Sequence, residues 1–181
     1  MLLARCSAEH CQRALFLAVR SGHERVVCLL LDHGAERDGR DEEGLTPLMV
    51  SARLGHVEVV SVLLEREGTG LEMSDSQGQT ALSHAVVSSQ PNTARRLLEA
   101  GARLQTLHTN QRSLLELTLL QEDLEMLETL LECGAESPDS LLELAMELDQ
   151  PAALTLLLEK GTEVSVSGQT WALARDKQQY L

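Results

Sequence analysis

Short leucine-rich segments recur along the chain, and each is followed by a glycine and a small residue. The clearest copies read LLDHGA, LLEAGA, LLECGA and LLEKGT, at 30–35, 97–102, 130–135 and 157–162. The glycines follow a period of 33 residues, with one extra residue before Gly68 and six fewer before Gly161. A fixed period of this length is the signature of a repeat architecture. Because 37 of the 181 residues are leucine and only 2% are aromatic, we expect the repeated unit to consist of packed helices.

Each repeat carries start and stop signals for two helices. A Thr or Ser that can cap free backbone N–H groups precedes the first helix, at Thr46, Thr80, Ser113, Ser140 and Thr170. The second helix is predicted to begin at Val57, Pro91, Leu124 and Pro151, where proline loses no hydrogen bond. Glycines that favour the left-handed conformation then follow it, at Gly34, Gly101, Gly134 and Gly161.

Two neighbouring segments carry the signature of a known family. DEEGLTPLM at 41–49 and DSQGQTAL at 75–82, together with the Gly-His pair at 55–56, resemble the turn and helix start of ankyrin repeats. The resemblance implies an all-α ankyrin-repeat solenoid of stacked antiparallel helix pairs with short β-hairpin or turn fingers. It covers nearly all of a single expected domain, 1–181. The expected repeats are 7–39, 40–73, 74–106, 107–136 and 137–166, with a partial repeat at 167–181.

The outer repeats depart from the family pattern. Repeat one has Ala-Glu-His-Cys at 8–11 in place of the turn, which is typical of a terminal cap or of a cut from a longer array. Repeat four has Gln111 and Glu122 where glycines are expected, and repeat five is six residues short, so we expect well-formed fingers only between repeats one to three. Trp171 is expected to close the stack, and 168–177 faintly resembles the end of the array in TANC-type scaffold proteins.

Charge and composition exclude several classes of function. The chain holds 15 basic and 28 acidic side chains, a formal net charge of −13. This charge argues against binding to the phosphates of nucleic acid or to anionic lipid, and no apolar run approaches the roughly 18 residues of a membrane span. Four scattered cysteines do not form a disulfide framework, so we expect reduced thiols and a cytoplasmic or nuclear protein.

No sequence motif points to catalysis or to a cofactor. The chain has neither a phosphate-binding glycine loop nor the sequence context of a nucleophilic serine. Cys6, His10 and Cys11 lie close together, but a structural zinc site needs four ligands and no fourth is nearby. We therefore expect no enzyme activity, no cofactor and no metal.

Several histidines and cysteines have a structural and a functional interpretation. His23 and His56 match the family's histidine after glycine, which the resemblance implies is structural; a ligand or pH switch is the alternative. His84 is expected to be half-buried and hydrogen-bonded. Cys28 is expected in the core, and Cys133 is expected to be partly exposed, where it could sense oxidants.

The resemblance also implies where a partner binds. Ankyrin proteins bind partners on the concave face, through the fingers and the exposed ends of the first helices. The residues aligned with those positions are Arg20, Arg40, Glu42, Glu43, Leu45, Arg53, Leu54, Gln77, Gln79, Ser88, Asn110, Arg112, Leu120 and Gln121. Leu45, Leu54 and Leu120 are expected to be exposed. Such a patch flanked by charge is typical of a protein contact, although singly exposed leucines are also common.

The acidic residues are concentrated towards the C-terminal end. Residues 1–66 hold 8 basic and 10 acidic side chains, whereas 113–163 hold 13 acidic side chains and one basic, Lys160. Such a field would attract a basic segment. Helical periodicity, however, puts many of these acids opposite the leucines, as on a solvated outer surface, so both interpretations stay open.

The sequence thus predicts a non-catalytic, monomeric interaction module or scaffold. Its partner would be a protein or peptide with basic and apolar groups, bound on the concave face. One alternative is a stoichiometric inhibitor of a kinase or another enzyme, like the ankyrin-type cyclin-dependent kinase inhibitors. Another is an internal stacking segment of a larger scaffold protein.

Overall fold

The computed structural model describes residues 8–65, 70–104, 112–135 and 139–160, and in them the chain forms ten α-helices and no β-strand. The helices are α1 Ala8–Arg20, α2 Glu24–Asp32, α3 Pro47–Leu54, α4 Val57–Leu64, α5 Ala81–Val87, α6 Pro91–Glu99, α7 Leu114–Leu120, α8 Leu124–Glu132, α9 Asp139–Glu147 and α10 Pro151–Lys160. Each of the five full repeat spans predicted above contains one helix pair. The features predicted at Cys6, Asn110, Gln111, Gly161, Thr170, Trp171 and 168–177 lie outside the described residues.

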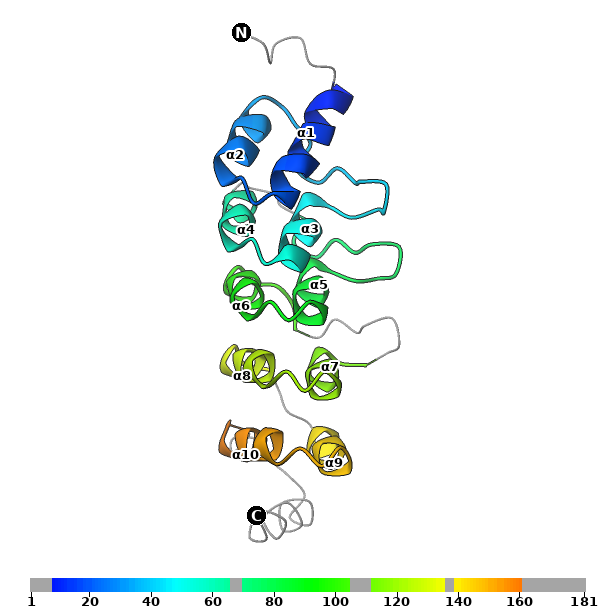
Figure 1. Cartoon of the computed structure of the whole chain (residues 1–181), viewed down its shortest axis with the longest axis vertical. Helices are drawn as coiled ribbons and strands as arrows, with labels where there is room; N and C mark the ends of the chain where they lie inside the picture. The colour runs from blue at the N-terminus through cyan, green and yellow to red at the C-terminus, as the bar shows by residue number, and fades with distance from the viewer. Residues whose placement is uncertain (1–7, 66–69, 105–111, 136–138, 161–181) are drawn as a thin grey trace.

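The ten helices stack as two columns (Figure 1). The odd-numbered helices α1 to α9 pack on one another in order, and so do the even-numbered helices α2 to α10. The turns at 40–46 and 74–80 project sideways from the odd-numbered column. One continuous apolar core, filled mainly by leucine, valine and alanine, runs between the columns. Because a single helix pair cannot bury its apolar face, this stacking is the source of stability in repeat folds.

The predicted starts of the first helices are confirmed in three repeats. The hydroxyls of Thr46, Thr80 and Ser113 accept hydrogen bonds from the backbone N–H groups three residues later, at 3.2–3.3 Å. Ser140 is not a cap, because α9 begins at Asp139 and Ser140 lies in its first turn. The sequence alignment placed this start wrongly because repeat five lacks six residues of its turn.

The second helices begin at the predicted residues Val57, Pro91, Leu124 and Pro151. They end as predicted at Gly34, Gly101 and Gly134, whose φ angles are +88°, +94° and +88°. At each glycine, the following N–H donates to the carbonyl five residues earlier, as Ala102 N does to Leu97 O at 3.0 Å. These are Schellman endings, and they turn the chain out of the helix towards the next repeat.

The first helices end at a second left-handed position, which the sequence keeps as glycine in only two repeats. Gly22, Gly55, Ser89, Glu122 and Asp149 all have positive φ there. A Cβ at Gly55 would also collide with the side-chain amide of Gln90 in the next repeat. Glycine therefore favours this left-handed position and leaves room for the neighbouring side chain, while Ser89, Glu122 and Asp149 show that repeats three to five keep the same backbone path without it.

The histidine of repeat two has the structural role that the resemblance implied. The His56 Nε2 donates to the carbonyl of Arg20 in the preceding repeat, at 3.2 Å, and the ring packs against Gly22. His23 is exposed and caps α2 without a side-chain hydrogen bond. Cys133 is half-buried, as expected, but Cys28 is also half-buried and not in the core, because its side chain points towards the Asp32 carboxylate at the end of α2.

The turns between repeats are closed by an aspartate and contain no β-strand where the structure describes them. Asp41 N donates to Leu45 O, and the Asp41 Oδ1 accepts from the N–H groups of Glu43 and Leu45 at 2.9–3.0 Å. Asp75 closes the next turn in the same way, with Gln77 and Gln79 as the donors. The fingers at 40–46 and 74–80 are thus tight turns held by side chains.

Replacing Gly101 with valine should lower the free energy of unfolding by about 1–2 kcal/mol, because a β-branched residue is strained at positive φ. Nothing lies within 4 Å of the added Cβ, so the loss would report backbone strain alone. Urea unfolding measures the effect. Ala100→Val, at the exposed neighbour whose φ is −79°, is the matched control and should change stability much less. Equal stability of the two variants would refute the strained ending.

Candidate partner-binding surface

We call one surface of the stack the first-helix face. It is formed by the accessible residues of α1, α3, α5, α7 and α9, by residues within two positions of these helices, and by the turns 40–45 and 74–79. One column on it is defined by the residue two positions before each left-handed helix end. That column reads Arg20, Arg53, Val87, Leu120 and Glu147. It changes from basic through apolar to acidic along the stack, so the face offers different chemistry at its two ends.

Most of the predicted partner-binding residues lie on this face with accessible side chains. The exposed ones are Arg20, Arg40, Glu42, Glu43, Leu54, Gln77, Arg112, Leu120 and Gln121. Arg53 and Ser88 are half-buried. Leu54 and Leu120 are exposed as expected, at 43% and 39%, and Val87 adds a third apolar side chain at 38%. Nine of the fourteen candidates are therefore exposed, and three exposed apolar side chains lie at the ends of successive first helices without Leu45.

Two candidates are buried, and their expected exposure is wrong. Leu45 is 4% exposed and belongs to the core, and Gln79 is 8% exposed. Each directly precedes the cap residue of a first helix, and the aspartate turn points its side chain inward. For Leu45 this is the position of a hydrophobic staple with Val50, which is also buried. Leu45 therefore anchors the turn and is not available to a partner.

The arginines at the N-terminal end of the face are engaged within the protein. Arg20 pairs with Asp41 at 3.0 Å, and Arg53 pairs with Glu43 at 3.2 Å. Arg40 donates to the carbonyl of Gly44 and, at 2.8 Å, to that of Ser74, so it links two consecutive turns. Charge at this end is largely compensated internally.

A groove opens at this end between α1 and the first turn. Its volume is about 590 Å³, and its lining includes Phe16, Leu17, Arg20 and Glu43. Leu17 is 66% exposed, the largest exposure among the large apolar side chains of the described residues. Sequence reasoning missed this groove because repeat one matches the family pattern poorly there.

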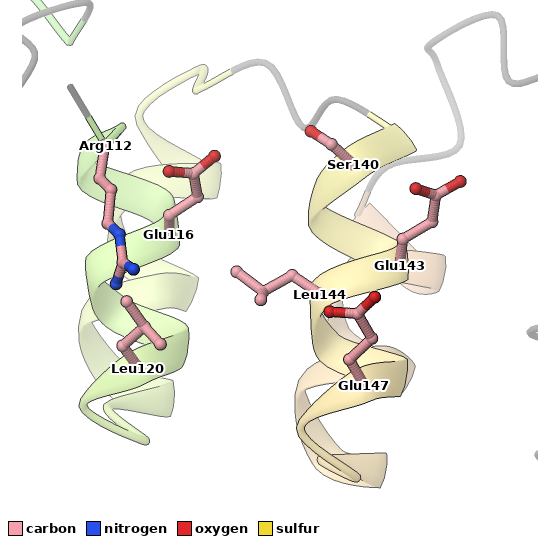
Figure 2. Close-up of a pocket in the computed structure, with 7 residues that line it drawn as sticks. All are labelled: Arg112, Glu116, Leu120, Ser140, Glu143, Leu144 and Glu147. Carbon is pink, nitrogen blue, oxygen red and sulfur yellow. The ribbon is translucent and has the colours of Figure 1, made fainter. Parts of the chain in front are cut away.

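A second, smaller hollow lies between α7 and α9 (Figure 2). We call it the α7–α9 hollow; it has a volume of about 280 Å³ and is lined by Arg112, Glu116, Leu120, Ser140, Glu143, Leu144 and Glu147. Leu144 projects from α9 towards α7, and Arg112 extends along α7. Sequence reasoning selected only Arg112 and Leu120 of this set, because α9 belongs to the repeat that aligns least well.

The acidic residues of the C-terminal repeats divide into two groups. On the even-numbered column, Glu132 bonds Lys160 at 2.7 Å and Arg95 at 2.9 Å, and Glu128 bonds Lys160 at 3.2 Å. The hydrogen bonds from Lys160 and Arg95 lower the pKa of Glu132. Around the α7–α9 hollow, by contrast, no ion pair joins Glu143 or Glu147 to any described residue.

A buried hydrogen bond between a carboxylate and a histidine holds the turn that begins repeat three. Asp75 Oδ2 accepts from His84 Nε2 at 3.0 Å, and the two side chains are 6% and 10% exposed. Burial raises the pKa of Asp75, but the hydrogen bonds from the N–H groups of Gln79 and Gln77 and from His84 together lower it by more. The net pKa of Asp75 lies below its ordinary value, and His84 is buried and hydrogen-bonded, close to expectation.

A family model for ankyrin repeats in three copies matches residues 15–108, which is more than half of the chain. The chain belongs to the ankyrin-repeat family. Ankyrin repeats in general bind proteins and are not catalytic themselves. The match covers the repeats with the best-formed turns and stops before the hollow.

Curated relatives align with the same ankyrin repeats. The E3 ubiquitin-protein ligase XBAT33 of Arabidopsis thaliana is 37% identical over 84 residues, or 46% of this chain and 16% of that protein. Inversin of Danio rerio is 35% identical over 83 residues, covering 45% and 8%. Rabankyrin-5 of Homo sapiens is 29% identical over 157 residues, covering 86% and 13%. The chain thus spans about a sixth or less of the length of these relatives.

Two further findings apply to the described part of this ankyrin array. None of its helices is long and apolar enough to cross a bilayer. None of its His, Cys, Asp and Glu side chains gather in the groups of three that a bound metal ion would need.

Replacing Asp75 with asparagine should lower the free energy of unfolding at pH 7 by roughly 1–2 kcal/mol, since the charged hydrogen bond to His84 is lost while the amide oxygen can still accept from the turn. Because folding lowers the pKa of Asp75, its carboxylate stabilises the folded protein at pH values above the ordinary pKa of about 3.9. This stabilisation disappears as the pH falls through the lower pKa that Asp75 has in the folded protein. Urea unfolding from pH 7 to pH 3 should therefore show a smaller acid-induced loss for the variant. Parallel curves for both proteins would contradict this, and Glu42→Gln, an exposed acid in the preceding turn, serves as control.

Proposed function

We propose that this ankyrin-repeat chain is a non-catalytic module that binds a protein or peptide on its first-helix face. One observation carries the proposal: Leu54, Val87 and Leu120, on three successive first helices, each leave about two fifths of the side chain exposed. Apolar side chains presented together and flanked by charge are typical of a protein contact. The general role of ankyrin repeats supports the same class of function.

The chemistry of the face suggests what the partner offers. Apolar groups of the partner would cover the leucines and Val87, and its basic groups would lie towards α7 and α9, where acids outnumber Arg112. The N-terminal end, where Arg20 and Arg53 are already paired, would contribute shape and hydrogen bonds more than net charge. Electrostatic complementarity of this kind acts mainly on association rate and specificity.

The lengths of the relatives help to choose between the alternative functions, an enzyme inhibitor and a segment of a larger scaffold. In each of them the matched region is a small part of a longer chain, which suits a stacking or scaffold segment more than a self-contained enzyme inhibitor. The cytoplasmic or nuclear location, the monomeric state and the identity of the partner stay predictions.

A double substitution of Leu54→Asp and Leu120→Asp should abolish partner binding, since buried apolar anchors dominate interface energies. Affinity capture from cell lysate with quantitative mass spectrometry, using the full chain as bait, measures this. We expect specific partners to fall at least about tenfold with this variant, the size of effect typical of such anchors.

The matched control is Leu29→Asp with Leu124→Asp, which introduces the same charges on exposed positions of the even-numbered column. Circular dichroism would verify that both variants keep their helices. Recovery of the same partners with both variants would place the binding site elsewhere.

Binding of the captured partner should weaken as salt rises, because the uncompensated acids are exposed and open to screening. We expect at least about a threefold loss of affinity between 50 and 500 mM sodium chloride, mostly in the association rate. Surface plasmon resonance with the purified partner separates the two rates. An affinity independent of salt would reject the basic character of the partner while leaving the apolar contact intact.

A further inference from the structure

The α7–α9 hollow combines an apolar surface with carboxylates that lack internal cations. Leu120 and Leu144 supply its apolar surface, and Glu116, Glu143 and Glu147 supply three carboxylates against the single guanidinium of Arg112. Glu116 also accepts from the N–H of Ser113 at 3.1 Å as part of a helix cap. Glu143 and Glu147 are exposed, and no ion pair or hydrogen bond joins their carboxylates to the described residues.

The positions of Glu143 and Glu147 on α9 are unfavourable for the isolated helix. Glu143 and Glu147 are four residues apart on α9, where like charges repel each other. Glu147 is also the last residue of α9, where a negative charge opposes the helix dipole. The acids of α8 at the same spacing, Glu128 and Glu132, share Lys160. Among the described residues of the first-helix face, Arg112 lines the same hollow but forms no ion pair with Glu143 or Glu147.

We infer that the α7–α9 hollow receives the side chain of an arginine from a bound peptide segment, whose neighbouring apolar side chain covers Val87 and Leu120. This inference rests on the proposed function. Charge complementarity argues for a cation, and the two leucines suit the methylene stem that an arginine lays along apolar surface. A planar guanidinium offers five donors in a fixed fork and is more weakly hydrated than an ammonium, so it suits two carboxylates beside an apolar surface better than a lysine does.

The size and ligand set of the hollow disfavour other occupants. Its volume of about 280 Å³ lies at the lower end of the roughly 300–1,000 Å³ of small-molecule sites. A metal ion would need side chains gathered within reach of one point, and no three His, Cys, Asp or Glu of the described residues are gathered so. A single long side chain that reaches in from a peptide on the first-helix face fits the small volume and needs no cluster of metal ligands.

The test is a selection from a phage-displayed library of random linear peptides on the full chain. The same library is panned on Glu143→Gln/Glu147→Gln and on a control, Glu58→Gln/Glu125→Gln. The control removes two exposed charges from α4 and α8. We expect peptides selected on the wild type and the control to share an arginine beside an apolar residue, and peptides selected on Glu143→Gln/Glu147→Gln to lack that arginine.

A selected peptide then allows a direct measurement of the contact. Replacing its arginine with citrulline removes the charge and keeps the shape. Affinity for the wild type should fall about tenfold, as for a coupled charge pair at an interface, and affinity for Glu143→Gln/Glu147→Gln should not change. An equal loss on both proteins, or selection of lysine in place of arginine, would overturn the inference.

Stability separates a binding role from a structural one. Thermal unfolding of Glu143→Gln/Glu147→Gln should occur at the same or a higher temperature than in the wild type, because the repulsion on α9 is removed. A lower melting temperature would show that these acids stabilise the fold and would overturn the inference.

The outcomes also distinguish this inference from the proposed function. Peptides that require Leu54 and Leu120 but show no preference for arginine would refute the arginine contact alone. The absence of any selected peptide whose binding depends on Leu54 or Leu120 would refute both.

Discussion

The structure depends on the burial of one helix pair by the next. No pair in this chain carries an apolar face that it could bury alone, and the core is continuous from α1 to α10 because each pair packs on its neighbours. Leucine suits this task, since it fits helices well and packs at many angles, and it occupies much of the core in place of aromatic residues. The spacing of the stack, in turn, places the turns and first helices side by side as one extended surface.

Close stacking makes specific demands where one repeat meets the next. The ring of His56 lies against Gly22 and donates to Arg20 O, and Gln90 lies where a side chain at residue 55 would collide with it. In later repeats glutamines span the same junctions: Gln121 donates to Val87 O and Gln150 donates to Leu119 O, at 3.0 and 2.8 Å. The family's Gly-His pair is thus one solution to a more general requirement, which is to satisfy the carbonyls at the ends of the first helices.

The distribution of charge follows from what each surface packs against. Glu128 and Glu132 on the even-numbered column pair with Lys160 and Arg95, and these pairs join α6, α8 and α10. Acids on α9 face the first-helix side and lack such partners among the described residues. A protein that keeps repelling charges on one face gives up a small amount of stability there, and this exchange is common at binding sites. The interpretation of the acids as part of a solvated outer surface therefore fits Glu128 and Glu132 of α8 better than Glu143 and Glu147 of α9.

The sequence by itself determined the helix boundaries and the fold. The 33-residue period, the Thr and Ser caps, the prolines at 91 and 151 and the glycines at 34, 101 and 134 act locally, through hydrogen bonds and φ angles within a few residues. The starts of both helices could be predicted from these signals in repeats two to four, and the start of α9 was misplaced where the turn is shortened. Tertiary structure alone decided which side chains a partner can reach. Leu45 and Gln79 turn inward because the aspartate turn closes over the helix start. Glu143 and Glu147 meet Leu120 across a hollow because repeats four and five stack. The geometry of the hollow depends on distances between residues tens of positions apart, which the stacking of the repeats sets and which no local pattern encodes.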